Sequence, residues 1–165
     1  MSEILESVYR EHRQGLFSLA VSVTGSHQIA EDSIQTAFTR LFQRPLPEGD
    51  LVAYVYKSVR NAAIDSKRKD SRITQLKDSL INGYRPTTEK AGPEEILMTK
   101  ERHSILRDAI ENLDADDQEA IVLKSFAGLT FDQAAAVTDT PAKTIASRYR
   151  RALQKLERQL SQKLD

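Results

Sequence analysis

The stretch LTFDQAAAVTDTPAKTIASRYRRALQKLERQL, residues 129–160, contains the strongest local signals for the fold. Its segment Thr130-Phe-Asp-Gln133 has the spacing of a capping box, in which each of the two outer side chains accepts a hydrogen bond from the other residue's backbone N–H. This spacing predicts a helix over 131–138. Thr140-Pro141 then offers a capping residue followed by a proline at the first helical position, which predicts that the last helix starts here.

The last helix has a sharply divided surface. At 100° per residue, apolar side chains share one face: Ile145, Tyr149, Ala152, Leu153, Leu156 and Leu160. Polar and basic side chains share the opposite face: Lys143, Ser147, Arg151, Gln154 and Arg158, with Thr144 beside them. Two helices separated by so few residues indicate a helix-turn-helix. The alternative is an amphipathic helix that packs on its neighbours and turns a basic face to solvent.

A helix-turn-helix of the DNA-binding kind places the start of its second helix in the major groove. We therefore expect Lys143, Thr144 and Ser147 near base edges. We expect three further side chains within reach of phosphates or guanines: Arg148, Arg150 and Arg151.

The rest of the chain also has helical periodicity, and no useful length alternates with period two, so the predicted fold class is all-α. Stop and cap signals predict helices over 3–24, 27–43 and 51–69, with Gly25 as a stop and Ser26 and Asp50 as caps. These helices form the predicted first domain, residues 1–72. Residues 73–93 are rich in glycine and proline and predict a flexible linker. The predicted second domain, 94–165, has helices from Glu94 and over 116–127, 131–138 and the C-terminal stretch.

Composition excludes several classes of function. The chain has 165 residues and no cysteine, and its three histidines are scattered, so we expect neither metal nor cofactor. No run of 18 apolar residues or secretory leader is present in the sequence, which predicts a cytoplasmic protein without a membrane span. Asp114, Asp116 and Asp117 lie where helix caps belong rather than in a catalytic pair, so we do not expect an enzyme.

The charges are balanced overall but segregated along the chain. Twenty-four basic residues match 24 acidic ones. Residues 44–72 carry 7 basic and 4 acidic residues (net +3), and 140–165 carry 7 and 2 (net +5). Between them, 105–139 carry 2 basic and 8 acidic residues (net −6). Two separate basic patches suit contact with a polyanion at two places, although each patch alone is also typical of a solvated helix face.

The predicted helix 51–69 mixes rings, amides and cations on one side: Tyr54, Lys57, Arg60, Asn61, Ile64 and Arg68. This mixture suits unstacked bases better than a closed duplex, because a ring or an apolar group stacks on a base while cations hold phosphates. The alternative is that Tyr54 and Ile64 are ordinary boundary residues that pack on the first helix.

The predicted helix 27–43 leaves a polar stripe outside its apolar face: Asp32, Gln35, Thr36, Thr39 and Gln43, with Phe42 at the margin. A polar stripe beside an exposed aromatic ring is typical of a docking face for another protein's helices. A solvated face is the alternative.

These helices, in this order, resemble the extracytoplasmic-function (ECF) class of bacterial RNA polymerase sigma factors. Asp32-Ser-Ile-Gln35-Thr-Ala-Phe38 matches the family's D-x-x-Q-x-x-F. Leu51-Val-Ala-Tyr54-Val-Tyr-Lys-Ser-Val-Arg60-Asn61-Ala-Ala-Ile64-Asp65 is similar to its F-x-A-W-L-Y-x-I-A-R-N-x-x-x-D. Further matches lie in the second domain: Leu113–Leu123, Gly128-Leu-Thr-Phe and Thr144-Ile-Ala-Ser147-Arg148.

The resemblance implies a dissociable initiation subunit that binds core RNA polymerase and promoter DNA. It implies that Asp32 and Gln35, with Thr39 and Phe42 as further candidates, bind polymerase, while Phe38 belongs mainly to the core. It implies that the helix 51–69 lines the path of the melted minus-ten strand, that the loop from Arg44 to Asp50 receives a flipped base, and that the second domain reads the minus-thirty-five element. It also implies an anti-sigma partner. The alternative is a stand-alone helix-turn-helix transcriptional regulator.

The sequence departs from the family pattern in three places. Tyr54 replaces a tryptophan, which keeps a ring. Thr138-Asp139-Thr140 replaces Leu-Gly-Ile in the turn, and aspartate tolerates a left-handed backbone less well than glycine, so we expect a wider or slightly strained turn. In the last helix, Lys143 and Ala146 stand where the family commonly has glycine and lysine.

Overall fold

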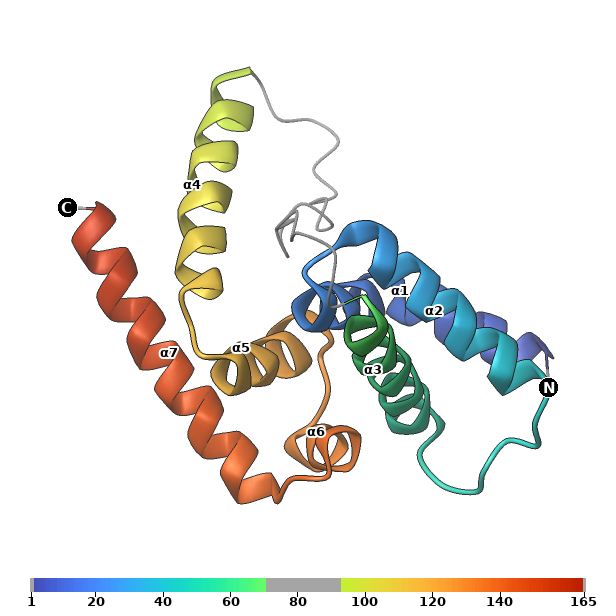
Figure 1. Cartoon of the computed structure of the whole chain (residues 1–165). Coiled ribbons are helices and arrows are strands. Elements are labelled where there is room, and N and C mark those ends of the chain that lie inside the picture. Colours follow the sequence, from blue (N-terminus) through green and yellow to red (C-terminus); the bar gives the residue numbers. More distant parts are fainter. Residues whose placement is uncertain (1, 71–92, 165) are drawn as a thin grey trace.

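The structure is a computed structural model that describes residues 2–70 and 93–164, and within these ranges every regular element is helical (Figure 1). The N-terminal domain contains α1 (Ser2–Thr24), α2 (His27–Phe42) and α3 (Leu51–Lys69). The C-terminal domain contains α4 (Pro93–Glu111), α5 (Ala115–Ile121), the π-helical turn η2 (Val122–Phe126), α6 (Phe131–Thr138) and α7 (Ala142–Leu164). The all-α prediction is confirmed, whereas the linker predicted over 73–93 lies outside the described residues apart from Pro93.

Three predicted helix starts are confirmed by their capping bonds. The Ser26 hydroxyl accepts from the N–H of Ile29 at 3.3 Å, and the Asp50 carboxylate accepts from the N–H of Ala53 at 3.0 Å. The capping box is complete, since Thr130 and Gln133 exchange bonds of 2.9 and 3.0 Å. These bonds satisfy backbone N–H groups that have no partner within the helix.

The last helix starts one residue later than predicted. Its first bond runs from the N–H of Ile145 to the carbonyl of Pro141, so the proline occupies the capping position instead of the first helical position. The Thr140 hydroxyl makes no capping bond to this helix and instead donates to the carbonyl of Thr138 at 3.1 Å. The left-handed turn residue is Asp139, with φ of 51°, and among the described residues it is the one non-glycine with positive φ.

The predicted helix 116–127 is not a uniform α-helix. After α5 the chain widens into η2, where the N–H of Ala127 donates to the carbonyl of Val122 at 2.9 Å. Gly128, with φ of +70°, then ends the element. Such i→i+5 turns are rare and occur mostly as single turns inside α-helices, so helical periodicity alone does not predict one.

The cores of the two domains are in contact. Large side chains of α1 and α3, such as Leu16 and Val59, belong to the same buried cluster as Leu123 of η2 and Ile145 of α7. The helix α3 packs against α6, and α1 packs against η2 and α5 (Figure 1). Buried side chains thus continue from one predicted domain into the other.

The apolar face predicted for α7 is confirmed except at one position. Ile145, Ala152 and Leu156 are buried, and Tyr149 packs edge-on against Phe131 with ring centroids 5.8 Å apart. Leu153 is instead 44% exposed. The buried stripe of α7 is therefore narrower than the helical periodicity suggests.

Candidate nucleic-acid and protein-docking surfaces

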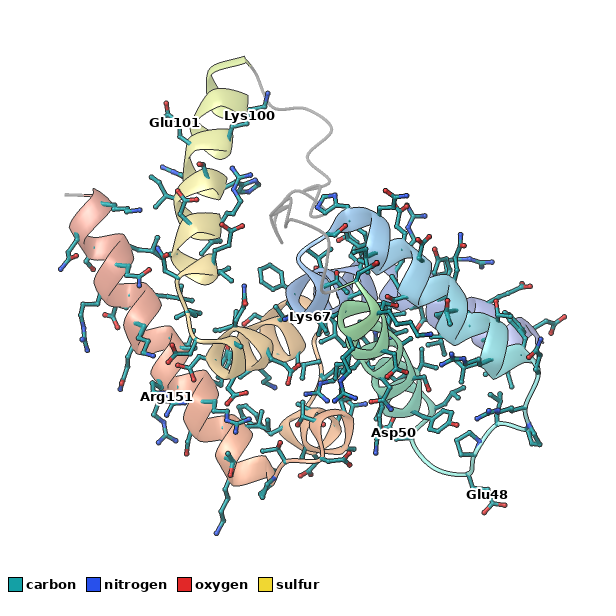
Figure 2. All side chains as sticks on the ribbon, viewed as in Figure 1. Glu48, Asp50, Lys67, Lys100, Glu101 and Arg151 are labelled. Atoms are coloured by element: carbon teal, nitrogen blue, oxygen red, sulfur yellow. The ribbon has the colours of Figure 1, made fainter. Side chains whose placement is uncertain are left out.

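The outer face of α3 carries an exposed ring, an amide and a cation in one row. Tyr54, Asn61 and Arg68 are seven residues apart, which is close to two helical turns, and all three are exposed. Ile64 lies half-buried between them. The adjoining loop from residue 44 to residue 50 is also largely exposed, and Asp50 lies where that loop enters α3 (Figure 2). Bases and phosphates therefore have access to this row.

Two other predicted residues of α3 are already engaged by the C-terminal domain. The Lys57 ammonium lies 2.9 Å from the Asp139 carboxylate. The Arg60 guanidinium donates from Nε and Nη2 to both oxygens of Glu119, at 2.9 and 3.2 Å. The six predicted residues thus divide into an open row and a pair of cations that face the other domain.

The start of α3 also contacts the C-terminal domain. The side-chain amide of Gln133 donates to the Asp50 carboxylate at 3.0 Å. The pKa of Asp50 is lowered, first by the capping bond from the Ala53 N–H and then by this amide. Asp50 therefore caps its own helix and contacts α6 of the other domain.

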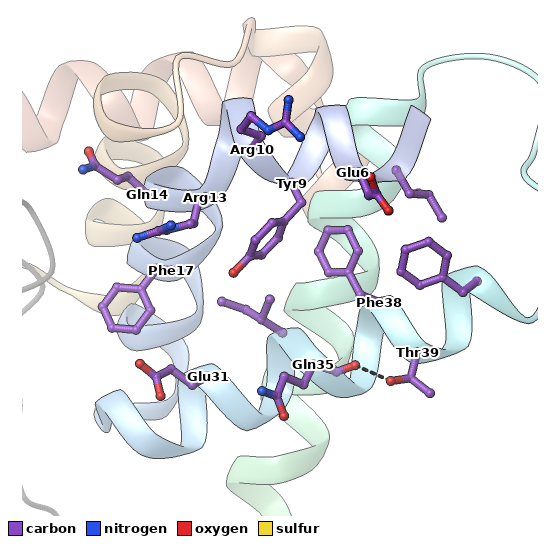
Figure 3. A pocket seen from close by; sticks show the side chains of 13 residues that line it. Glu6, Tyr9, Arg10, Arg13, Gln14, Phe17, Glu31, Gln35, Phe38 and Thr39 are labelled. Atoms are coloured by element: carbon purple, nitrogen blue, oxygen red, sulfur yellow. Dashed lines mark hydrogen bonds between the residues drawn. The ribbon is translucent and has the colours of Figure 1, made fainter. Parts of the chain in front are cut away.

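An open groove of about 1130 Å³ runs between α1 and α2 (Figure 3). Three of the four predicted polymerase-binding residues line it: Gln35, Thr39 and Phe42. Asp32 lines a shallower depression that adjoins the groove along α2 and shares Gln35 and Thr39 with it. The Phe42 ring is 48% exposed, whereas Phe38 is mostly buried, as the resemblance implies. The docking side chains predicted from α2 are therefore gathered on one accessible surface.

The opposite wall of this groove was missed by the sequence analysis. It comes from α1, where Tyr9, Arg13 and Phe17 repeat every fourth residue and point into the groove (Figure 3). The Tyr9 ring, which is 40% exposed, packs edge-on against Phe38 with centroids 5.2 Å apart. A row of rings and a cation at helical spacing was the signal in the sequence.

The basic face of α7 is partly free and partly held by α5. Lys143, Ser147 and Arg150 are exposed, and Thr144 is half-buried. Arg148 approaches Asp116 at 3.6 Å. Arg151, on the side of α7 next to α5 (Figure 2), binds Asp117 through Nε at 3.1 Å and Nη2 at 2.6 Å. Arg151 therefore has a structural contact in addition to its predicted role at DNA.

Asp117 is the polar centre of the contact between α5 and α7. Its side chain is fully buried and also accepts from Lys155 at 2.9 Å. The hydrogen bond from Arg151 is the main reason why the pKa of Asp117 is lowered, and Lys155 adds to the effect. Asp114, although it precedes α5, makes no side-chain capping bond and instead accepts from Lys155 at 3.3 Å. These carboxylates therefore anchor α7, the second helix of the helix-turn-helix, to α5.

No cluster of three metal-ligating side chains occurs in the part of the chain that the structure describes. Across residues 2–70 and 93–164, no helix has both the length and the apolar character needed to cross a membrane.

Comparison with known protein families assigns both domains. The family model for sigma-70 region 2 matches residues 8–73, and the model for sigma-70 region 4 matches residues 103–156. The ECF RNA polymerase sigma factor SigL of Mycobacterium tuberculosis is 27% identical over 93% of this chain and 86% of its own. The chain belongs to the ECF sigma factors. The alternative, a stand-alone helix-turn-helix regulator, is not favoured because it explains the region 4 match but not the region 2 match.

Two further relatives of this sigma factor differ in length. The ECF RNA polymerase sigma-E factor of Escherichia coli is 26% identical over 94% of this chain and 92% of its own. The ECF RNA polymerase sigma factor SigE of Mycolicibacterium smegmatis is 26% identical over 92% of this chain, which spans 59% of that protein.

Solved structures share the fold of this sigma factor. The sigma factor RpoE of Bartonella quintana, in complex with the anti-sigma factor NepR, superposes with a TM-score of 0.67 at 21% identity, over 97% of this chain and 96% of the other. CnrH, in complex with the cytosolic domain of CnrY, gives a TM-score of 0.64 at 19% identity, over 98% and 90%.

Proposed function

We propose that this ECF sigma factor binds core RNA polymerase, directs it to promoters and helps to open the DNA. Residues 1–72 dock on polymerase through α2 and contact the minus-ten element through α3. Residues 94–165 read the minus-thirty-five element through α7, and 73–93 join the two. The observation that carries this proposal is the order of the two surfaces: a row that suits unpaired bases on a region 2 domain, then a basic helix-turn-helix on a region 4 domain.

The chemistry is binding without catalysis by this chain. Opening a duplex costs about 1.4 kcal/mol per stacked step, and each unpaired base that stacks on a ring returns about 1–3 kcal/mol. A few captured bases therefore shift the local equilibrium, provided that polymerase holds both domains in register. The proposal places this action in the cytoplasm, where bacterial promoters are, and includes an anti-sigma protein as a further partner.

Run-off transcription tests the proposal as a whole. Purified core polymerase is incubated with genomic fragments, with and without this chain, and the start sites are mapped. We expect specific transcripts only when the chain is present. We also expect weak DNA binding by the chain alone, since the segment 105–139, with a net charge of −6, opposes nonspecific attraction to DNA. Tight sequence-specific binding by the free chain, without polymerase-dependent transcripts, contradicts the proposal and favours a stand-alone regulator.

The docking assignment is tested on α2. Asp32→Ala and Gln35→Ala are each expected to weaken the affinity for core polymerase about 5–30-fold, the range of an interface residue worth about 1–2 kcal/mol. Both side chains are exposed, so helicity measured by circular dichroism stays unchanged. The matched control is Gln28→Ala, an exposed change on the same helix outside the groove and the depression. Normal polymerase affinity for both Asp32 and Gln35 variants moves the docking site elsewhere.

A further inference from the structure

The inner cations of α3 are bound by carboxylates in the way that they would bind phosphates. Arg60 presents Nε and Nη2 to the two oxygens of Glu119, at 2.9 and 3.2 Å. This two-bond geometry is the one that arginine also uses with phosphate groups. Lys57 lies 2.9 Å from Asp139. Each carboxylate is therefore paired with a cation that, in the proposed function, binds the melted minus-ten strand.

The two carboxylates come from separate elements that only the folded C-terminal domain brings together. Glu119 belongs to α5, and Asp139 is the left-handed residue in the turn between α6 and α7. Their bonds span 59 and 82 residues of sequence. Both belong to the segment 105–139, with a net charge of −6, which packs against the α3 segment of opposite sign. The complementarity therefore extends beyond the two ion pairs.

A close backbone approach supports the same contact. Gly15 of α1 is buried, and a Cβ atom at this position would lie only 2.9 Å from Cα of Ala127, just after η2. It would also clash with the Tyr56 hydroxyl, which bonds to His12 within the N-terminal domain. The absence of a side chain at Gly15 is therefore what lets the C-terminal domain approach α1.

We propose that these contacts form an interdomain latch, Lys57–Asp139 and Arg60–Glu119, which keeps the free sigma factor closed and withholds Lys57 and Arg60 from single-stranded DNA. The DNA part of this inference rests on the proposed function. The docking groove between α1 and α2 lies outside the latch, so polymerase has access to it while the domains are closed. Opening then follows when a partner binds the separated domains more tightly than the closed pair.

The two halves of the latch differ in exposure. The Arg60 and Glu119 side chains are 23% and 14% exposed, whereas Lys57 and Asp139 are 38% and 75% exposed. Solvent and salt screen the exposed pair more strongly. The Arg60–Glu119 pair is therefore the stronger half, and Glu119→Gln should open the domains more than Asp139→Asn.

Energy transfer in the full chain tests the latch without DNA. The sequence has no cysteine, so Gln28→Cys on α2 and Gln162→Cys on α7, both exposed, accept a dye pair specifically. In this background, Glu119→Gln with Asp139→Asn is expected to lower the transfer efficiency. The matched control is Glu111→Gln with Asp132→Asn, which removes two charges from the same acidic segment at exposed positions outside the latch. Equal efficiencies in the latch and control variants overturn the proposal.

A second readout separates the latch from the proposed function. The affinity for a fluorescent mixed-sequence single-stranded DNA of 12 nucleotides is expected to rise about tenfold in the latch variant, in the range of one charge-assisted hydrogen bond, and to stay unchanged in the control. If the transfer efficiency falls but the affinity does not rise, the latch holds the domains together and the DNA role of Lys57 and Arg60 is wrong.

An independent variant disturbs the backbone contact between Gly15 and Ala127 instead of the ion pairs. Gly15→Ala, made together with Tyr56→Phe to remove the hydroxyl, leaves Ala127 as the main obstacle to the new methyl group. We expect a loss of transfer efficiency relative to Tyr56→Phe alone, with helicity retained. If the closed efficiency persists in this variant, the close approach at Gly15 is not part of the latch and the proposal loses its apolar support.

Discussion

Asp117→Asn is expected to lower the free energy of unfolding at pH 7 by about 2–3 kcal/mol, and with it the midpoint of thermal unfolding by about 5–10 °C. Asp117 is fully buried and accepts charge-assisted bonds from Arg151 and Lys155. The amide keeps the volume and one acceptor oxygen but loses the charge that both cations require. The cost stays below that of a fully buried pair, because the two cations remain in contact with solvent.

The stabilisation by Asp117 is expected to disappear in acid. The folded state lowers the pKa of Asp117 below its ordinary value of 3.8. The ionised carboxylate therefore stabilises the fold above about pH 3.8, and this contribution is lost as the pH falls through the lowered value. Unfolding curves of wild type and Asp117→Asn should differ at neutral pH and converge in acid. A gap that stays constant from pH 7 to strongly acidic solution contradicts the assignment.

Arg150 and Arg151 provide a matched comparison on the same helix. Arg151→Ala is expected to lower the unfolding midpoint, and a double-mutant cycle with Asp117→Asn should show coupling because the two side chains share one contact. Arg150 is exposed, so Arg150→Ala should leave unfolding unchanged and weaken promoter binding of the polymerase complex by about 1–3 kcal/mol if it reaches bases. Equal stability losses in both variants contradict the structural role of Asp117.

Local signals in the sequence were sufficient for the helices but not for their contacts. Ser26, Asp50 and the pair Thr130–Gln133 were identifiable as caps because each bond joins residues three positions apart. The π-turn η2 was not predictable, since a rare single turn inside a helix has no periodicity of its own. The ion pairs of the latch join residues 59 and 82 positions apart, and charge counts do not select which carboxylate meets which cation.

The candidate surfaces show the same limit. Periodicity placed Tyr54, Asn61 and Arg68 on one outer row, and the structure leaves all three exposed. Periodicity also assigned Lys57 and Arg60 to this DNA-binding row, although both form ion pairs with the C-terminal domain. Helical periodicity specifies the direction in which a side chain points from the helix axis. Tertiary packing decides which residues of other helices lie in that direction.

Tyr54→Ala is expected to reduce promoter opening by polymerase about 10–100-fold, while Tyr54→Trp retains it. The Tyr54 ring is 37% exposed at the start of α3, so its loss removes a surface for stacking rather than a core contact. A base that stacks on a ring gains about 1–3 kcal/mol, which corresponds to about 5–150-fold in an equilibrium constant. Run-off transcription on a duplex promoter measures the loss, and unchanged thermal unfolding verifies that the fold is intact.

A template with a mismatched, already open minus-ten segment identifies the step that Tyr54 assists. Each duplex step that need not be opened saves about 1.4 kcal/mol, so polymerase on this template depends less on stacking energy from the sigma factor. The deficit of Tyr54→Ala should therefore shrink on the open template. The alternative reading of Tyr54 as a boundary residue that packs on α1 predicts the reverse pattern: lower stability, and an equal deficit on both templates. Normal opening by Tyr54→Ala on the duplex promoter removes Tyr54 from the proposed minus-ten surface.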